Sequence, residues 1–320
     1  MTTSGTLTFL GHRFHPLTLA DKDMLQDYLR RYPQHVSGYT FATLAAYAPI
    51  YGIVWSRVGP ECLLLARRLG DDLHLLQPIG KPTDACCDGL LEAAMALPYP
   101  LQMTYVAKAY IEANPRFCAH FTVEEDRASA NYIYVARDLA ELAGGRYAKK
   151  RNLISQFQTL HPDWSAAPLD AGCGAICRQI LLDIAQEDGI DPEDTSHLEE
   201  LRALDFTMTH FDALEQNGVL IRVAGQPVGF AIWERQNVET AAVHFEKALR
   251  AYKGLYQMVN RETARAIVAT GFHLINREED VGDPGLRQAK LSYSPLDITP
   301  VYDLTLRPDM DHRQSDNTGT

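Results

Sequence analysis

The sequence predicts an α+β protein of two similar domains, each a mixed, mostly antiparallel sheet flanked by helices. Three observations lead to this prediction. The 320-residue chain exceeds a typical single domain, and its 46% hydrophobic content suffices for two cores. The same order of helical and strand patterns occurs twice along the chain. Near the C-terminus, two apolar strand-like segments flank a helix, so we expect them to run parallel. Their polar ends, residues 244–247 and 276–280, are then expected to meet at one edge of the sheet.

The first predicted domain, residues 1–130, begins with two helices. Leu25, Tyr28 and Leu29 recur at helical spacing behind Asp21, a suitable N-cap. A three-strand meander with Gly and Pro turns follows, and then a helix–strand–helix–strand series. The predicted helices are Asp21–Tyr32, Thr40–Ala48, Asp84–Ala96 and Lys108–Asn114, and the predicted strands are Tyr51–Arg57, Cys62–Arg68, Leu73–Gln77, Leu101–Val106 and Phe117–Glu124.

Residues 131–162 form the predicted connection. Tyr132–Val135 has strand character, and Asp138–Ala143 a short helical pattern. Gly144-Gly145 interrupts it, and a longer helix is predicted from Arg146 to Leu160.

The second predicted domain, residues 163–306, repeats the order of the first. Its predicted helices are Gly174–Glu187, Ser196–Glu215 and Tyr256–Thr270, with a short element at Gly285–Ala289, and its predicted strands are Val219–Val223, Val228–Glu234, Thr240–Glu246, Phe272–Asn276 and Thr299–Leu306. This is the element order of the GNAT acyltransferase fold, so we expect tandem GNAT-like domains. Residues 307–320 are polar and predicted to be disordered.

Composition excludes several classes of protein. The formal net charge of −11 argues against non-specific binding to nucleic acid or anionic membranes. No apolar stretch is long enough for a transmembrane helix, and the N-terminus lacks the layout of a signal peptide, so a cytoplasmic location is expected. The six cysteines include no CxxC pair, so no metal site is predicted.

Four segments carry a family resemblance. They read ANYIYVARDLAELAGGRYAKKRNLISQF, AAVHFEKALRAYKGLYQMVN, LINREEDVG and GLRQAKLSYSP. Together, over about Asn131–Pro295, they resemble the soluble DUF2156 family, which shares the C-terminal domain of phosphatidylglycerol lysyltransferases. The resemblance implies a tandem GNAT-like fold akin to the Fem-type aminoacyltransferases. It also implies transfer of an acyl group from an activated carrier, typically aminoacyl-tRNA.

A basic segment marks the start of the longer connecting helix. Four of the six residues from 146 to 151 are cations, and Asn152 follows them to complete a Lys-Lys-Arg-Asn sequence. The candidate binding residues of this segment are Arg146, Lys149, Lys150, Arg151 and Asn152. One interpretation is a solvated helix face. The other is a clamp on a phosphate or on a tRNA acceptor end, because helix starts favour anions.

The end of the third strand of the second meander carries His244, Glu246 and Lys247. Alternation places His244 and Glu246 on one face, with Lys247 on the other. Glu246 is a candidate base for an amine acceptor if burial raises its pKa, and His244 is the alternative base. A structural alternative is an ion pair of Glu246 with Lys247, Arg250 or Arg277.

The loop that follows occupies the place of the acetyl-CoA pyrophosphate loop. Arg250 is one residue too far from Gly254, and Tyr256 replaces a small residue there. CoA is therefore disfavoured, since small residues let the backbone approach the pyrophosphate. Lys253 remains as an anion contact, and Tyr252 and Tyr256 either stack on a base or pack.

Five polar residues follow the last parallel strand. An ordinary solvated turn is one interpretation of Asn276–Asp280, and an organised polar site at the mouth of a cleft is the other. In the second, Glu278 or Asp280 holds the α-ammonium of an aminoacyl group, and Arg277 holds a phosphate or carboxylate. Further members of this predicted site are Arg287, Lys290 and Tyr293.

The function predicted from these features is an aminoacyltransferase. It moves an aminoacyl group from aminoacyl-tRNA to an amine or hydroxyl acceptor, a lipid or a small molecule, without a metal or redox cofactor. Glu246, His244 and Arg277 are the predicted catalytic residues. The alternatives are an N-acyltransferase that uses acyl-CoA and a non-catalytic module that binds an anionic ligand.

Overall fold

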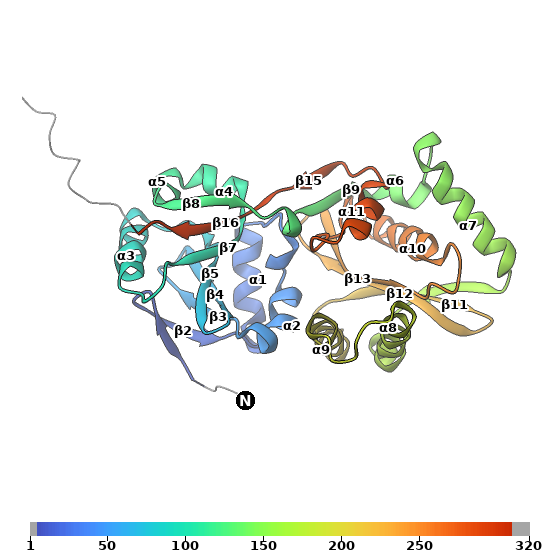
Figure 1. The fold of residues 1–320 in the computed structure, drawn as a ribbon, viewed down its shortest axis with the longest axis horizontal. Coiled ribbons are helices and arrows are strands. Elements are labelled where there is room, and N and C mark those ends of the chain that lie inside the picture. Colours follow the sequence, from blue (N-terminus) through green and yellow to red (C-terminus); the bar gives the residue numbers. More distant parts are fainter. Residues whose placement is uncertain (1–4, 309–320) are drawn as a thin grey trace, which may run out of the picture. The chain divides into compact units, whose positions relative to one another are not determined.

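The computed structural model describes residues 5–308, and these divide into two compact units. The first contains residues 5–32, 51–127 and 300–308, and the second contains residues 33–50 and 128–299. Each unit has one mixed, mostly antiparallel sheet with flanking helices (Figure 1), so the predicted fold class is confirmed. The part of the predicted tail from residue 309 onward lies outside the described residues.

The first unit contains a nine-stranded sheet. Its strands are β1 (Leu7–Phe9), β2 (His12–Pro16), β3 (Val54–Arg57), β4 (Cys62–Leu69), β5 (Asp72–Leu76), β6 (Ile79–Gly80), β7 (Gln102–Ala107), β8 (Phe121–Glu125) and β16 (Val301–Leu306). Its helices are α1 (Lys22–Arg31), α3 (Asp84–Met95), α4 (Lys108–Ala113) and α5 (Pro115–Cys118). Only β5 and β7 pair in parallel.

The second unit contains a seven-stranded sheet. In spatial order its strands are β10 (Trp164–Pro168), β11 (Asn217–Val223), β12 (Gln226–Arg235), β13 (Thr240–Ala248), β14 (Leu274–Asn276), β9 (Asn131–Val135) and β15 (Asp297–Thr299). Its helices are α2 (Phe41–Tyr51), α6 (Ala136–Glu141), α7 (Ala148–Leu160), α8 (Gly174–Asp188), α9 (Thr195–Thr209), α10 (Leu255–Ala269) and α11 (Pro284–Leu291). Only β13 and β14 pair in parallel.

The two sheets repeat one topology. In each, a three-strand antiparallel meander leads through a helix to a strand that runs parallel to the third meander strand. The helix is α3 in the first unit and α10 in the second. The predicted duplication and the predicted parallel pair are therefore confirmed.

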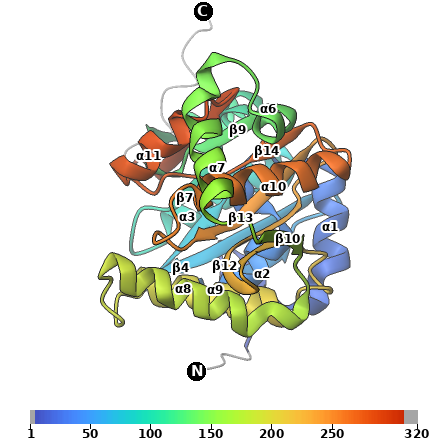
Figure 2. The same cartoon turned by 90° about the vertical axis from the view of Figure 1, so that its right-hand side faces the viewer.

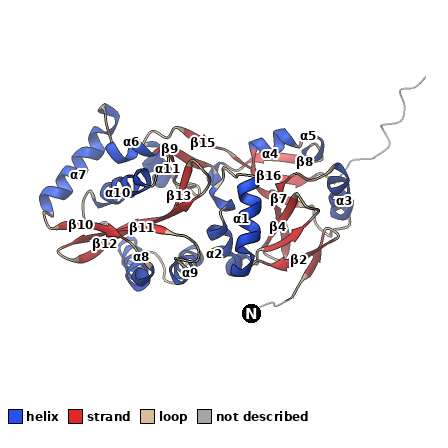
Figure 3. Ribbon diagram, turned by 180° about the vertical axis from the view of Figure 1, so that it is seen from behind, coloured by secondary structure: helices blue, strands red, loops and turns tan. Residues whose placement is uncertain are grey.

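Two cores cover the two faces of the second sheet. Leu255, Met258 and Ile267 of α10 pack with Val219 and Ala231 on one face. Helices α8 and α9 pack on the other face, against Phe230 and Phe245 among others. Figures 2 and 3 show α10 and the pair α8 and α9 on opposite sides of strands β11–β13.

The divisions between units differ from the predicted ones. Helix α2 belongs to the second unit, because Ala46, Tyr47 and Ile50 pack in the core formed by α8 and α9. Strand β9 lies in the second sheet beside β14, and β16 lies in the first sheet between β7 and β8. The final strand therefore completes the sheet of the first half.

Several local predictions are wrong. Residues 115–118 form a short helix where the strand Phe117–Glu124 was expected, since Pro115 occupies a first helical position. Helix α9 ends at Thr209 rather than at Glu215. Five short strands were not predicted: β1, β2, β6, β10 and β15.

Candidate functional site

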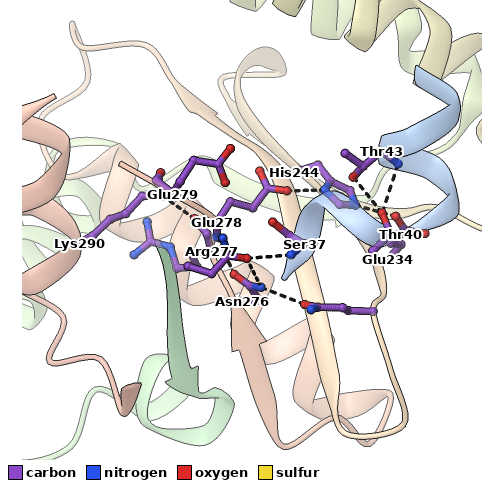
Figure 4. A network of polar contacts seen from close by, with 12 residues as sticks. Ser37, Thr40, Thr43, Glu234, His244, Asn276, Arg277, Glu278, Glu279 and Lys290 are labelled. Carbon is purple, nitrogen blue, oxygen red and sulfur yellow. Dashed lines mark hydrogen bonds and ion pairs between the residues drawn. The ribbon is translucent and has the colours of Figure 1, made fainter. Parts of the chain in front are cut away.

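The candidate site lies where two parallel strands separate. Thr240–Ala242 of β13 pair with Leu274–Asn276 of β14, but β14 ends there while β13 continues to Ala248. His244 and Glu246 thus extend beyond the paired region. The loop after β14 supplies the polar residues that contact them: Glu278 contacts His244 (Figure 4), and Arg277 contacts Glu246. The two predicted polar stretches, 244–247 and 276–280, do meet.

His244 stands at a β-bulge. Ile232 pairs with Phe245 and Trp233 with Val243, so no residue of β12 opposes His244. Val243 packs in the core under α10 and Phe245 in the core under α8 and α9. Strict alternation, which predicted that His244 and Glu246 share a face, therefore breaks at His244.

Two carboxylates hold the His244 imidazole. Its Nε2 lies 2.8 Å from Glu234 Oε1, and its Nδ1 lies 2.7 Å from Glu278 Oε1 (Figure 4). Burial alone would lower the pKa of His244, but the charge of Glu278 and hydrogen bonds with both carboxylates raise it to about 10. His244 is therefore a cation at neutral pH, so it is not the free base that the sequence suggested.

Arg277 and Glu246 form a buried ion pair. Arg277 Nη2 donates to Glu246 Oε1 at 2.9 Å, and Arg277 Nε donates to Oε2 at 3.1 Å. Both side chains are less than a tenth exposed. Asn260 of α10 also lies within hydrogen-bond distance of both Glu246 oxygens. Of the interpretations of Glu246, the ion pair with Arg277 is the one the structure contains, since both carboxylate oxygens are engaged.

Asp280 is committed to the scaffold. Tyr132 donates its hydroxyl to Oδ2 at 2.6 Å, and Arg287 donates to both carboxylate oxygens at 2.8 and 2.9 Å. Despite burial, the Arg287 and Tyr132 hydrogen bonds hold the pKa of Asp280 far below its usual range. Asp280 is fully buried, so it is unsuited to the predicted α-ammonium contact.

Glu278 and Glu279 are partly exposed neighbours on the loop. Glu278 adopts a left-handed backbone conformation, with φ of 59°, and its N–H donates to Asn276 Oδ1. This conformation is costly for a residue with a side chain. Burial and the nearby Glu278 carboxylate raise the pKa of Glu279 to about 7. A pKa in this range suits Glu279 to exchange a proton near neutral pH.

Lys290 and Asn276 hold this loop through hydrogen bonds with its backbone. The buried Lys290 ammonium donates to the carbonyls of Arg277 and Glu279. Burial and the charge of Arg277 lower the pKa of Lys290 to about 8. Asn276 Nδ2 donates to Asn131 Oδ1 at 2.8 Å, and the Ser37 N–H donates to the same oxygen. Both residues act as structural supports.

The predicted basic segment divides into structural and free cations. Arg146 pairs with Asp138, and Arg151 donates to the carbonyls of Leu142 and Gly144 at the end of α6. Lys150 points toward Tyr293. Lys149 and Asn152 are exposed, and neither has a hydrogen-bond or ion-pair partner among residues 5–308.

The loop before α10 is filled by protein contacts. Gly254 has φ of 87°, and a Cβ atom there would lie 2.2 Å from the Leu153 carbonyl oxygen of α7. Arg250 pairs with Asp188. Tyr252 packs against His161, with ring centroids 5.2 Å apart. Lys253 remains exposed.

The other predicted residues are engaged as follows. Tyr256 accepts a hydrogen bond from Arg277 Nη2 at 3.0 Å. Burial and the Glu246 charge raise the pKa of Tyr256 to about 12. Lys247 pairs with Glu200 of α9 at 2.6 Å, on the opposite face from Glu246, and so lies away from Arg277 and Glu246.

Four residues of the site were not predicted from the sequence: Glu234, Glu279, Tyr132 and Asn260. Glu279 lies in the segment LINREEDVG that carries the family resemblance, and this was a signal for it. Glu234 ends a meander strand, as Glu246 does, and that position was the available signal. Nothing in the pattern around Tyr132 or Asn260 shows which carboxylate each one reaches.

Among residues 5–308, no group of three or more His, Cys, Asp or Glu side chains is arranged to hold a metal ion. No helix in this range has the length and apolar character needed to cross a bilayer.

The chain is similar to known proteins over nearly its whole length. A family model described as phosphatidylglycerol lysyltransferase, C-terminal, matches residues 29–305. The crystal structure of a conserved protein of unknown function from Bacteroides thetaiotaomicron VPI-5482 is 30% identical, with a TM-score of 0.85. The similarity covers 92% of this chain and 99% of that one. No protein with a curated function matches the chain.

Two more distant structures share the fold. FemX has a TM-score of 0.59 at 9% identity, over 91% of this chain and 96% of its own. A tandem GNAT protein from the clavulanic acid biosynthesis pathway has a TM-score of 0.50 at 10% identity, over 93% and 99% of the two chains. The protein therefore has the predicted tandem GNAT-like fold, and it belongs to the family defined by the C-terminal domain of phosphatidylglycerol lysyltransferase.

Proposed function

We propose that the protein is an aminoacyltransferase that moves an aminoacyl group from aminoacyl-tRNA to an amine or hydroxyl acceptor in the cytoplasm. Membership of a lysyltransferase family supports transfer of an acyl or aminoacyl group. An aminoacyl ester is already activated, so the protein must align the acceptor, take up its proton and stabilise the developing oxyanion. The acceptor is a small molecule or a lipid.

The observation that carries the proposal is the state of the carboxylates at the strand separation. Glu246 is fixed by Arg277, and Asp280 by Tyr132 and Arg287. Glu278 has one oxygen on His244, and its side chain is 23% exposed. Its other oxygen is available for the α-ammonium of an aminoacyl group. Glu279, with a pKa of about 7, takes the proton of the acceptor and delivers it to the ribose oxygen of the tRNA when the ester bond breaks.

His244 and Arg277 are positioning residues in this proposal. The imidazolium of His244 fixes Glu278, and Arg277 fixes Glu246 and the hydroxyl of Tyr256. The proposed base thus moves from Glu246 and His244 to Glu279, because both predicted bases are held in ion pairs.

The loop before α10 favours a carrier other than acyl-CoA. The Leu153 carbonyl occupies the space where a side chain of residue 254 would lie. Gly254 is therefore needed for the packing of α10 on α7, and it does not offer a close approach to a pyrophosphate. Arg250 is paired with Asp188. Exposed Lys149 and Lys253 are available for RNA phosphates.

Thermal protection tests the carrier. A ligand that binds only the folded state raises the melting temperature with its concentration. The proposal predicts that aminoacyl-tRNA raises it more than the same tRNA without its amino acid, and that CoA and acetyl-CoA leave it unchanged. Protection by acetyl-CoA alone would contradict the tRNA assignment.

A further inference from the structure

Arg277 and Tyr293, whose side chains are in contact, each have a buried polar atom without a hydrogen-bond partner among residues 5–308. Arg277 Nε and Nη2 donate to Glu246 and Tyr256, but Nη1 has no hydrogen-bond partner among residues 5–308. The hydroxyl of Tyr293 likewise has none within that range. Arg277 is 5% exposed and Tyr293 is 1% exposed. An unpaired buried donor costs free energy, so two together point to a missing partner.

A second cation lies against the same tyrosine. Lys150 Nζ is 4.0 Å from the centre of the Tyr293 ring, and Arg277 Cζ is 5.0 Å from it. The hydrogen-bond partner of Lys150 is the Ser292 hydroxyl, at 2.6 Å. No carboxylate of the described residues lies within ion-pair distance of Lys150.

The charges around Tyr293 do not balance. Arg277 is neutralised by Glu246, whereas Lys150 has no acid partner among the described residues. Burial and the charge of Arg277 lower the pKa of Lys150, as expected for a cation that lacks a counter-ion. A group with two or three anionic oxygens, each accepting a hydrogen bond of about 2.8 Å, can bridge an ammonium and a guanidinium.

We infer that Lys150, Tyr293 and Arg277 form a phosphate-binding subsite. Resting on the proposed function, we assign it to a phosphodiester near the aminoacylated end of the carrier RNA. Lys150 is the partly exposed member, so the phosphate arrives on its side. Because Arg277 Nη1 and the Tyr293 hydroxyl do not contact solvent in this conformation, binding requires a local shift of the Lys150 and Tyr293 side chains.

Tyr293→Phe is the sharpest variant for this inference. It removes a hydroxyl that makes no hydrogen bond within the described residues, and it keeps the ring that both cations contact. The folded protein should therefore be as stable as the wild type or more so. If phosphate uses the hydroxyl, its affinity should fall about tenfold, the usual effect of losing a hydrogen bond to a charged group.

The experiment is a calorimetric titration of the full chain with inorganic phosphate at constant ionic strength. Lys150→Met should weaken phosphate binding about tenfold or more, and Lys81→Met, which removes the same charge from an exposed position of the first unit, should leave it within about twofold. Equal phosphate affinity in wild type, Lys150→Met and Tyr293→Phe would overturn the inference, and so would no phosphate binding by the wild type.

A parallel titration with a short RNA ending in CCA separates this inference from the proposed function. Displacement of the RNA by phosphate, and weaker RNA binding by Tyr293→Phe, would support both. RNA binding that is neither displaced by phosphate nor weakened by Tyr293→Phe would overturn the subsite and leave the proposed function standing. Phosphate binding that depends on Lys150 and Tyr293, without any RNA binding, would support a phosphate subsite and contradict the assignment to RNA.

Discussion

His244 Nδ1 lies 2.7 Å from Glu278 Oε1, and this contact joins the bulge of β13 to the loop after β14. The imidazole also contacts Glu234 on β12, so one side chain links three segments across the strand separation. A cation between two carboxylates, nearly excluded from water, is held with fixed geometry. It offsets the strain of Glu278, whose backbone is left-handed.

Loss of His244 should change the pH dependence of stability. Its pKa is about 10 in the folded state and about 6.5 in an unfolded chain. Its stabilisation is therefore complete below pH 6.5 and is lost as the pH rises through 10. The difference in the free energy of unfolding between wild type and His244→Gln, measured by urea titration, should shrink from pH 6.5 to 10.

This comparison isolates His244 from Lys290. The lowered pKa of Lys290, about 8, acts in the opposite direction, because its folded form binds the proton less tightly. Lys290 is present in both proteins, so its contribution to the free energy of unfolding cancels to first order in the difference between them. A difference that stays constant over this pH range would mean that His244 is neutral.

Arg277→Met should be strongly destabilising. It leaves Glu246 buried without its cation, and breaking a buried ion pair costs about 3–5 kcal/mol. The double variant Arg277→Met with Glu246→Gln should recover a large part of the loss in free energy of unfolding. Arg250→Met is the control, since the Arg250 side chain is 73% exposed and its pair with Asp188 should be worth less than about 1 kcal/mol. Equal losses would show that the buried pair is no more important than the exposed one.

Glu279→Gln should abolish proton uptake from the acceptor. The rate of transfer by the wild type should rise with pH through about 7, because the base must be deprotonated. In Glu279→Gln the rate should fall about 100-fold or more, and this limb of the pH–rate profile should disappear. Glu246→Gln should retain the limb. Persistence of a midpoint near pH 7 in Glu279→Gln would remove Glu279 from this role.

Substitutions of Lys149 and Arg151 should have different effects, one on tRNA binding and the other on the stability of the fold. Lys149→Glu should weaken tRNA binding and leave the melting temperature nearly unchanged, because Lys149 has no partner in the described structure. Arg151→Met should lower the melting temperature, since it removes hydrogen bonds to the carbonyls of Leu142 and Gly144. Filter binding and calorimetry measure the two effects. A Lys149→Glu protein that binds tRNA like the wild type would exclude this helix face.

Gly254→Ala should test the packing of α10 on α7. Its Cβ would lie 2.2 Å from the Leu153 carbonyl oxygen, so the helices must move apart. We expect a loss of about 2 kcal/mol or more in the free energy of unfolding. Gly271→Ala is the matched control: its φ of 92° is similar, but no atom lies within 4 Å of its Cβ position, so it carries only the backbone strain. Equal losses would refute the close contact.

The fold was predictable because its signals are local. Turn residues and alternating apolar positions locate β11–β13, and the helical period locates α10, so the parallel pair of β13 and β14 follows. Helix α2 was assigned to the wrong unit because its apolar residues could pack in either core. The structure shows that Ala46 packs in the core formed by α8 and α9, and no sequence pattern indicates this contact.

The location of the site was predictable from the sequence, but which of its charged side chains contact one another was not. The ends of β13 and β14 had to converge once the strands were parallel. Whether Glu246 is a base or half of an ion pair depends on where Arg277 points, and the bulge at His244 also escapes a one-strand pattern. Glu234 and Asn260 contribute from separate elements, and no spacing in the sequence links them to His244 or Glu246.

The most direct measurement uses tRNAs charged with isotope-labelled amino acids, incubated with the protein and a cell extract. Mass spectrometry then identifies every molecule that gains the label. We predict a labelled amine or hydroxyl acceptor with the wild type and at least about 100-fold less of it with Glu279→Gln. Label that stays on tRNA, or is lost at the same rate with both proteins, would contradict the proposed aminoacyl transfer.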